Sequence, residues 1–151
     1  MLGDLRSASN VQGLLGAVAV KAGDAEAGLK LVSAACAYFR GQGDPFGLFS
    51  TLSTRARILH DLGRDLESRS DYLESVESAK SCGTTKTMEY YQTLSGLAEA
   101  EEGLGHSEEA TRVARQALAD AKPLADQYRW RGADFERALV VLKRIAGDLS
   151  K

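Results

Sequence analysis

The sequence is poor in the residues that interrupt helices, bind metals or form membrane spans. Its 151 residues include only two prolines, two cysteines and two histidines. Few prolines leave long stretches open to helix formation, because a proline inside a helix removes a hydrogen bond and clashes with the preceding turn. No window approaches the ~20 apolar residues of a membrane-spanning helix. We therefore expect an all-α protein without a membrane segment.

Cysteine and histidine are too few and too far apart for a metal or redox site. Cys36 and Cys82 lie in separate alanine- or serine-rich stretches, without the close pairing that zinc and redox motifs require. His60 and His106 have no partner at the spacing of metal ligands. The sequence thus predicts buried or half-buried free thiols, no metal and no cofactor.

The N-terminal residues and the composition indicate the compartment and the size of the fold. The first residues, Met-Leu-Gly-Asp-Leu-Arg, include an early acid and no apolar run before a cleavage site, so they do not resemble a secretory signal. Hydrophobic residues make up 44% of the chain and charged residues 26%, which is typical of globular proteins. We expect a cytoplasmic protein with one domain, residues 1–151, because a chain of this length can bury a sizeable core.

Charge is unevenly distributed along the chain. The formal net charge is −2, yet residues 61–109 contain 12 acidic and 4 basic residues. This acidic middle is either a solvated flank or a surface that steers a partner or favours head-to-tail association. The overall sign makes nucleic acid an unfavoured partner. A basic patch keeps that alternative open, and it consists of Arg129, Arg131, Arg137, Lys143 and Arg144.

Helical periodicity predicts seven helices. In the first, Val11, Leu14, Leu15 and Val18 recur at steps of three and four residues, which predicts an inward face. The fourth has a thinner apolar stripe that is interrupted by Arg69 and Asp71. The expected helices cover residues 9–22, 25–40, 45–62, 65–81, 88–104, 107–122 and 123–146.

Polar residues and prolines mark where these helices begin. Asp24 and Asp44 are expected to accept hydrogen bonds from free backbone N–H groups. Pro45 suits the first helical position, because proline loses no hydrogen bond there. Ser107 is expected to cap the sixth helix, and Pro123 to begin the seventh.

Four glycines recur in phase with these helices. Gly23, Gly63, Gly105 and Gly147 are spaced by 40, 42 and 42 residues, and each closes one helix just before a polar residue opens the next. Small residues recur at fixed offsets from them, where helices would cross closely. This pattern is typical of a repeat array. It predicts hairpins at about 9–41, 44–82 and 84–122, with half a repeat at 123–151.

The phased residues resemble the tetratricopeptide repeat. Leu15-Gly16, Leu97-Ala98 and Leu139-Val140 stand where that family has Leu-Gly, whereas Arg55 replaces an expected leucine. The period of 40–42 residues is similar to that of kinesin light chain repeats and of the repeat tails of bacterial ATP-dependent transcription regulators. The resemblance implies a right-handed α-solenoid of about 3.5 antiparallel helix-turn-helix repeats and seven helices. It also implies that the first helix of each repeat lines a concave groove for a peptide or partner domain.

Positions that precede each phased glycine by 13, 10, 6, 3 or 2 residues are expected to face this groove. Internal pairing of Arg57 and His60 with Glu99 and Glu102 is the alternative for four of them. The candidate groove residues are Asn10, Lys21, Ser53, Arg57, His60, Gln92, Ser95, Glu99, Glu102, Arg137 and Arg144.

The last expected helix is apolar on more than one side. A terminal repeat should present a polar outer face to water, so we expect another element to cover this helix. Either the chain belongs to a longer array, or the face pairs with its copy in a homo-oligomer. The candidate self-association residues are Leu139, Val140, Val141, Leu142 and Ile145.

These observations predict a non-enzymatic scaffold that binds a protein or peptide. The sequence has no nucleophile beside a base, no paired catalytic carboxylates and no phosphate-binding loop after a strand. Two alternatives remain, a ligand-sensing regulatory repeat domain of a larger bacterial transcription regulator and a self-associating homo-oligomer.

Overall fold

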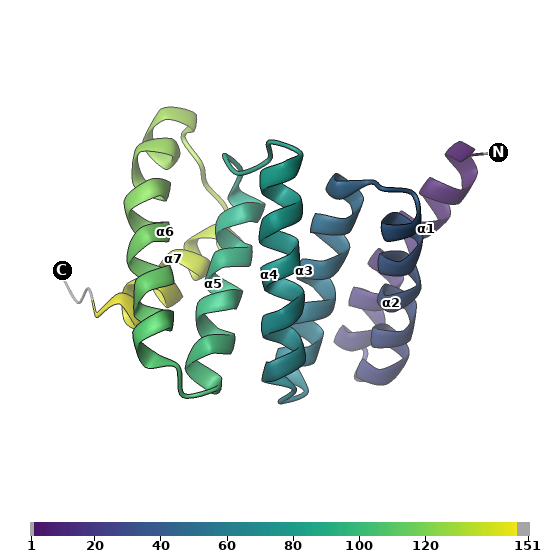
Figure 1. Cartoon of the computed structure of the whole chain (residues 1–151), viewed down its shortest axis with the longest axis horizontal. Coiled ribbons are helices and arrows are strands. Elements are labelled where there is room, and N and C mark those ends of the chain that lie inside the picture. The colour runs from purple at the N-terminus through teal and green to yellow at the C-terminus, as the bar shows by residue number, and fades with distance from the viewer. Residues whose placement is uncertain (1, 148–151) are drawn as a thin grey trace. The chain divides into compact units, whose positions relative to one another are not determined.

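The computed structural model describes residues 2–147, apart from the side chains of residues 2–6, 9 and 10, and it is all-helical over that range (Figure 1). The prediction of an all-α protein with seven helices is confirmed for these residues. The helices are α1 (Leu2–Lys21), α2 (Ala25–Gly41), α3 (Pro45–Asp61), α4 (Asp65–Ser81), α5 (Met88–Gly103), α6 (Ser107–Tyr128) and α7 (Ala133–Ala146).

The chain forms two compact units, residues 1–82 and residues 83–151. The first unit contains α1 to α4, in which α1 pairs with α2, α2 packs on α3, and α3 pairs with α4. The second unit contains α5 to α7, and each of these helices contacts the other two. Figure 1 shows α7 crossing behind α5 and α6 in that view. A solenoid of one domain remains a prediction, and each unit is described below by itself.

The phased glycines end their helices as the sequence predicts. Gly23, Gly63, Gly105 and Gly147 have φ angles between 71° and 91°, a left-handed conformation that costs glycine nothing and other residues more. Each glycine N–H donates to a carbonyl three residues earlier, as Gly63 does to His60 at 2.8 Å. The turns between paired helices are therefore short and alike.

Two of the predicted caps are confirmed and one is not. Asp24 accepts from the N–H of Ala27 at 3.1 Å, and Asp44 accepts from the N–H of Gly47 at 3.0 Å. Ser107, in contrast, is the first residue of α6, and the side chain of His106 at the capping position before it makes no capping hydrogen bond to the helix. Its hydroxyl therefore stands one residue too late to cap the helix.

The first helix begins earlier than predicted and packs through its other face. It starts at Leu2 rather than at residue 9. The side that meets α2 is made by Gly16, which is buried, whereas Leu14 is 69% exposed. A Cβ placed on Gly28 of α2 would lie 2.5 Å from the carbonyl oxygen of Gly16. The two backbones approach so closely that only small residues fit at this crossing; Val20 still packs against the core, whereas the predicted stripe from Val11 to Val18 is exposed.

The boundary between the last two helices also differs from the prediction. Pro123 lies inside α6, which continues to Tyr128, and α7 begins at Ala133. An internal proline costs a helix about 3 kcal/mol, but the turn after Pro123 still packs in the unit, where Leu124 and Ala125 are half-buried. The helix instead ends at Tyr128, and the C-cap that follows it, Arg129, is the only described residue other than glycine with a positive φ, at 52°.

The cores of the two units differ in composition. In the first, Val32, Cys36, Leu52 and Ile58 form a buried apolar cluster between α2 and α3. In the second, six alanines of α5 and α6 are buried together with larger residues, which include Phe135 and Leu142 of α7.

We expect Gly28→Ala to lower the free energy of unfolding by about 1–3 kcal/mol, because the added methyl group would force α1 and α2 apart. Replacing glycine with alanine inside a helix normally stabilises a protein by about 0.5–1 kcal/mol. A loss of stability in Gly28→Ala would therefore indicate the close crossing of α1 and α2. Gly41→Ala in the same helix is the control, since its Cβ would meet no atom within 4 Å. Urea denaturation followed by circular dichroism measures both, and equal effects would contradict the close crossing.

Candidate interaction surfaces

The groove candidates of the first unit divide into residues that hold the α3–α4 hairpin and residues that are exposed. Ser53 on α3 lies 2.6 Å from the hydroxyl of Ser75 on α4. Nδ1 of His60 contacts a carboxylate oxygen of Asp65 at the start of α4. Arg57 is exposed on α3. The last two candidates lie on α1, where Lys21 is exposed and the side chain of Asn10 lies outside the described ones.

The groove candidates of the second unit include a pair that links two helices. Arg144 of α7 donates two hydrogen bonds to the carboxylate of Glu102 on α5, both at 2.8 Å. The hydrogen bond from Arg144 lowers the pKa of Glu102 from its ordinary value. Glu102 is thus held by an arginine of its own unit, just as His60 contacts a carboxylate of its own hairpin.

The remaining candidates of this unit vary in exposure. Ser95 is buried at 4% exposure, whereas Gln92 and Glu99 are half-buried. Arg137 is exposed on α7 and donates to Asp134 one turn earlier at 3.3 Å. Of the six groove candidates in this unit, Ser95 is the one whose burial opposes contact with a ligand.

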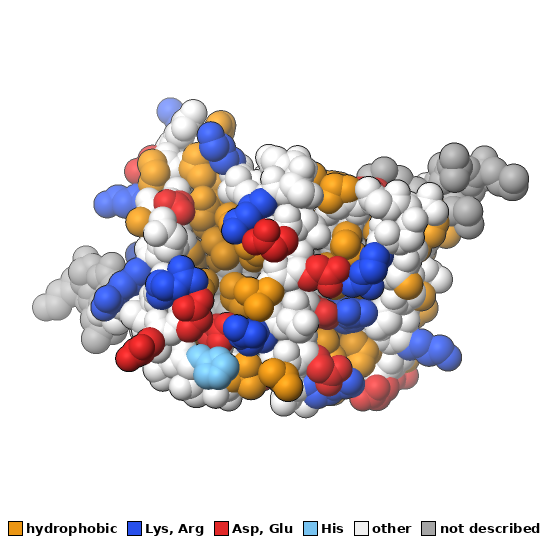
Figure 2. All heavy atoms as spheres, in the orientation of Figure 1, with side chains coloured by type: hydrophobic (Ala, Val, Ile, Leu, Met, Phe, Trp, Pro, Cys, Tyr) orange, Lys and Arg blue, Asp and Glu red, His pale blue; other side chains and the backbone are white. Residues whose placement is uncertain are grey.

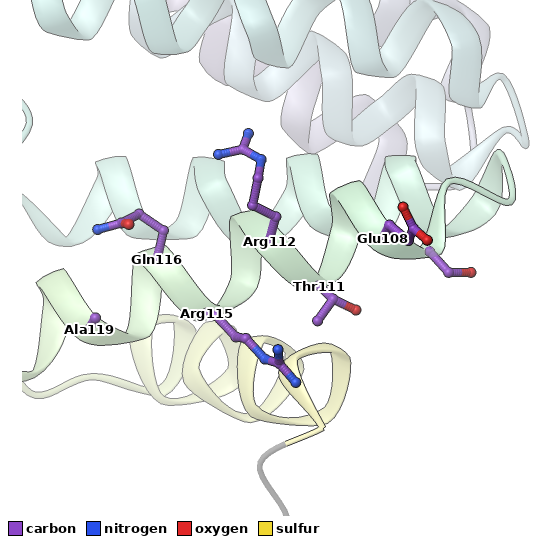
Figure 3. A pocket seen from close by; sticks show the side chains of 7 residues that line it. Glu108, Thr111, Arg112, Arg115, Gln116 and Ala119 are labelled. Atoms are coloured by element: carbon purple, nitrogen blue, oxygen red, sulfur yellow. The ribbon is translucent and has the colours of Figure 1, made fainter.

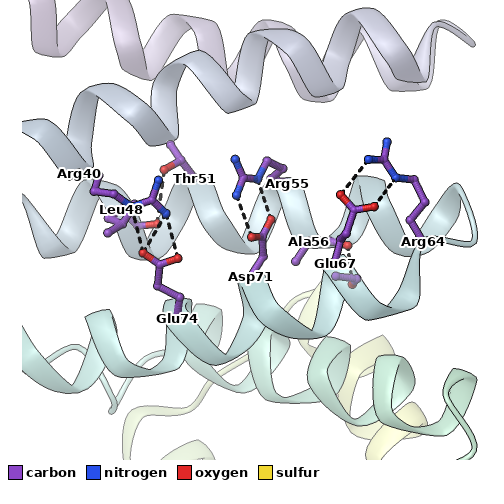
Figure 4. A network of polar contacts seen from close by, with 10 residues as sticks. Arg40, Leu48, Thr51, Arg55, Ala56, Arg64, Glu67, Asp71 and Glu74 are labelled. Carbon is purple, nitrogen blue, oxygen red and sulfur yellow. Dashed lines mark hydrogen bonds and ion pairs between the residues drawn. The ribbon is translucent and has the colours of Figure 1, made fainter.

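A ladder of three arginine–carboxylate pairs lines one face of α4 (Figure 4). The acids stand four and three residues apart along α4, so they share a face of the helix. Each is paired with an arginine from a different segment. From one end of α4 to the other the pairs are Arg64–Glu67, Arg55–Asp71 and Arg40–Glu74, with shortest distances of 2.8, 2.6 and 2.8 Å.

The middle pair of this ladder is the least accessible to water. The side chains of Arg55 and Asp71 are 21% and 9% exposed, against 48% and 42% for Arg40 and Glu74. The hydrogen bonds to Asp71 raise the pKa of the Arg55 guanidinium. Charge pairs gain strength as water is excluded, and losing one partner leaves the other without compensation. The Arg55–Asp71 pair therefore joins α3 to α4 more firmly than the outer pairs.

Both members of this pair depart from the pattern of the sequence. Arg55 stands where the repeat pattern expects leucine, and Asp71 interrupts the apolar stripe of the fourth helix. In the structure these two departures contact each other. Figure 2 shows basic and acidic side chains side by side over α2 to α4, and periodicity within single helices could not pair them.

Serine hydroxyls replace apolar contacts between α3 and α4. Ser68 donates to the carbonyl of Ala56 at 2.7 Å, and Ser75 donates to the carbonyl of Phe49 at 2.8 Å. Both serines are fully buried. A small hydroxyl lets two helices approach and still satisfies its own hydrogen bond, which explains how α4 packs with so thin an apolar stripe.

A cavity of about 270 Å³ lies beside the ladder, between α2, α3 and α4. Leu29 and Leu59 contribute apolar surface, and the ion pairs of Arg55 and Arg64 contribute charge. Burial raises the pKa of the nearby Cys36 thiol, and its side chain is fully buried. The cavity therefore offers a small polar site without a reactive thiolate.

A wider hollow of about 670 Å³ follows the outer side of α6 (Figure 3). Thr111 and Arg115 point toward α7, where they donate to the carbonyls of Ile145 and Ala146 at 3.3 and 3.2 Å. Arg112 points away from α7 and pairs with Glu109. Thr111 and Arg115 thus hydrogen-bond to carbonyls at the end of α7. Their positions in the hollow are therefore set by the packing of α6 on α7.

Five aromatic rings cluster where α6 gives way to α7. Trp130 lies 5.8 Å from Tyr91 and 5.4 Å from Phe135, measured between ring centroids, and Tyr128 stacks on it at 6.0 Å. Tyr90 meets Tyr91 edge to face. Tyr91 and Phe135 are buried, whereas Tyr128 is 53% exposed. The cluster fixes the loop that follows α6 against the other two helices.

The helices α1 and α7 differ in how many large apolar side chains they expose to solvent. On α1 the apolar stripe, defined as Val11, Leu14, Leu15 and Val18, is 49–69% exposed. On α7 one large apolar side chain is exposed, Val140 at 67%.

The residues of α7 that were predicted to self-associate therefore range from buried to exposed. Leu142 and Ile145 are buried inside the unit, at 0% and 9% exposure, while Leu139 and Val141 are half-buried. Exposed charged residues, including Lys143, flank Val140. The apolar run was expected to need an external cover, but α5 and α6 already bury its main side.

Among residues 2–147, no group of three or more His, Cys, Asp or Glu side chains is placed to hold a metal ion. None of the described helices combines the length and apolar character needed to cross a bilayer.

We expect Asp71→Ala to lower the free energy of unfolding by about 1–3 kcal/mol, because it leaves the half-buried Arg55 without its partner. Glu74→Ala, one turn later on the same face, is the matched control and should cost less than about 1 kcal/mol, since its pair is exposed. Chemical denaturation at neutral pH measures both. Equal losses would show that burial does not distinguish the two pairs.

Burial raises the pKa of Tyr91 from 10.0 to about 12. Between these values the unfolded chain has lost the phenol proton while the folded chain retains it, so stability falls as pH rises from about 10 toward 12. We expect Tyr91→Phe to reduce the fall in melting temperature between pH 9 and pH 11.5. Tyr128→Phe is the control, and a fall identical in all three proteins would refute this assignment.

Comparison of the sequence with protein-family models finds no match, and comparison with curated proteins finds none.

Proposed function

We propose that this protein is a non-enzymatic, cytoplasmic scaffold of helical hairpins that binds another protein or a peptide. The observation that carries the proposal is the apolar stripe of α1, where four large hydrophobic side chains are about half to two-thirds exposed on one helix face. Contiguous exposed apolar surface is characteristic of interaction sites, whereas single exposed hydrophobic residues are ordinary. A binding partner would remove this stripe from water.

The resemblance to tetratricopeptide repeats supports the same class of function. Helical hairpins closed by left-handed glycines present preformed surfaces, which lose little conformational freedom when a partner docks. Arg57 on α3 and Lys21 on α1 are exposed groove candidates of the first unit. A right-handed solenoid whose first helices form a concave groove remains part of this proposal.

The polar contacts support a structural use of the charged residues. The ladder ties α4 to α2, α3 and the turn before it, and the Glu102–Arg144 pair ties α5 to α7. Three of these pairs therefore connect two helices, whereas Arg64–Glu67 is local to the start of α4. We infer a scaffold whose charges hold its hairpins together.

A ligand-sensing regulatory domain of a larger transcription regulator is the second candidate. The cavity between α2, α3 and α4 favours it, because Ser33 and Ser70 add hydroxyls to a lining that already contains charge pairs and apolar surface. Such a lining suits a small polar molecule. At about 270 Å³ the cavity is smaller than the roughly 300–1,000 Å³ usual for ligand pockets, which places this function second.

The experiment that tests the proposal compares proteins that co-purify with tagged wild type and with the double variant Leu14→Glu/Val18→Glu. We expect the variant to lose its specific partners by more than about tenfold, because two charges on the stripe oppose its desolvation. Leu66→Glu on α4 is the matched control, since Leu66 is 69% exposed, as Leu14 is, and lies outside the stripe.

Circular dichroism verifies that each variant stays helical. A separate Arg57→Glu variant tests the predicted groove on α3. Equal recovery of every partner by wild type and by the double variant would exclude the α1 stripe as the binding surface.

A further inference from the structure

The apolar stripe of α1 corresponds to a face that another helix covers elsewhere in the same unit. Aligning α1 and α3 on the glycines that end their turns places Val11 and Val18 in register with Thr51 and Ile58. On α3 these positions are 6% and 1% exposed, and Ile58 belongs to the cluster that joins α3 to α2. The corresponding face of α1 therefore has the position of a face that packs against another helix.

The chemistry of the α1 face restricts what can cover it. Leu15 stands in the register of Arg55, and Val11 in that of Thr51, so the polar groups that α3 presents on this face are apolar on α1. Between residues 7 and 20 the sequence contains no charged side chain. A covering helix must therefore be apolar and uncharged along its contact line, because an unpaired charge would be desolvated there.

The stripe is complementary to itself when two copies run antiparallel. Its order is Val, Leu, Leu, Val, with spacings of three, one and three residues, and this order reads the same in both directions. Antiparallel pairing about a twofold axis midway between Leu14 and Leu15 places Leu14 opposite the partner's Leu15 and Val11 opposite the partner's Val18. A twofold contact requires this kind of self-complementary surface.

We propose that a second copy of this chain covers the stripe, so that two α1 helices pair antiparallel in a homodimer. The proposal rests on the proposed function in that both assign the α1 face to protein binding, and it names the partner. No charge on residues 7–20 of either copy opposes the approach. The sequence places the candidate self-association residues on α7, whereas this proposal assigns self-association to α1.

The dimer is expected to be weak and dependent on concentration. Four large side chains from each copy form a contact smaller than the roughly 800 Å² per partner of a standard stable interface. We therefore expect dissociation in the micromolar range or above rather than at nanomolar concentrations.

Sedimentation equilibrium of the full chain from about 1 to 500 μM tests the proposal. Wild type is expected to change from monomer to dimer in this range, whereas Leu14→Glu remains monomeric and Leu66→Glu dimerises as wild type does. Circular dichroism verifies helicity for each protein. A wild-type monomer at all concentrations, or a dimer that Leu14→Glu leaves intact, would overturn the proposal.

Disulfide formation tests the antiparallel register. In a Cys82→Ser background, where the remaining Cys36 is fully buried, mild oxidation of mixed Val11→Cys and Val18→Cys proteins should give a crosslinked dimer. Val11→Cys alone should not, because its two copies would be about 10 Å apart along the helix axes at 1.5 Å per residue. A crosslinked dimer of Val11→Cys alone would indicate parallel pairing and overturn the proposed geometry.

The two proposals can fail separately. If wild type stays monomeric while Leu14→Glu/Val18→Glu still abolishes capture of a different protein, the second copy is excluded and protein binding by α1 is retained. If the dimer forms as described and no other protein is captured, the stripe serves self-association alone. If neither dimer nor partner depends on α1, both proposals fail.

Discussion

The close approach of paired helices is the constraint on which the first unit depends. Gly16 and Gly28 bring the backbones of α1 and α2 to a separation that excludes even a methyl group, and Gly47 lies against the ring of Phe39 in the same way. Between α3 and α4, serine hydroxyls on backbone carbonyls achieve a similar contact. Small side chains thus occupy the interfaces where leucines would ordinarily stand, and larger apolar residues lie elsewhere.

This constraint explains why charge contributes so much to the position of α4. A helix that buries serines and alanines removes less apolar surface from water than one that buries leucines, so it gains less from the hydrophobic effect. The Arg55–Asp71 and Arg40–Glu74 pairs supply directional contacts to α3 and α2 in its place, and Arg55–Asp71 is the better shielded of the two. The uneven charge along the chain therefore reflects, in part, acids that are internally compensated.

Much of the fold could be predicted because it depends on local chemistry. Phased glycines, acidic caps and helical periodicity identified seven helices with boundaries close to those observed. The errors arose where tertiary contacts outweigh local preference: α6 continues through Pro123, and α1 packs through glycines rather than through its larger residues. The ladder and the cavity could not be predicted in the same way, because their residues lie on three different helices and one turn.

The Arg55–Asp71 pair also has a consequence for how the sequence can change over time. Replacing Arg55 with the leucine that the repeat pattern favours would leave Asp71 without its charged partner, and replacing Asp71 alone would leave Arg55 without its own. Either single step lowers stability, whereas a double change to two apolar residues of similar volume restores a packed interface. Positions 55 and 71 should therefore covary across descendants of this gene, as a charged pair or as an apolar pair.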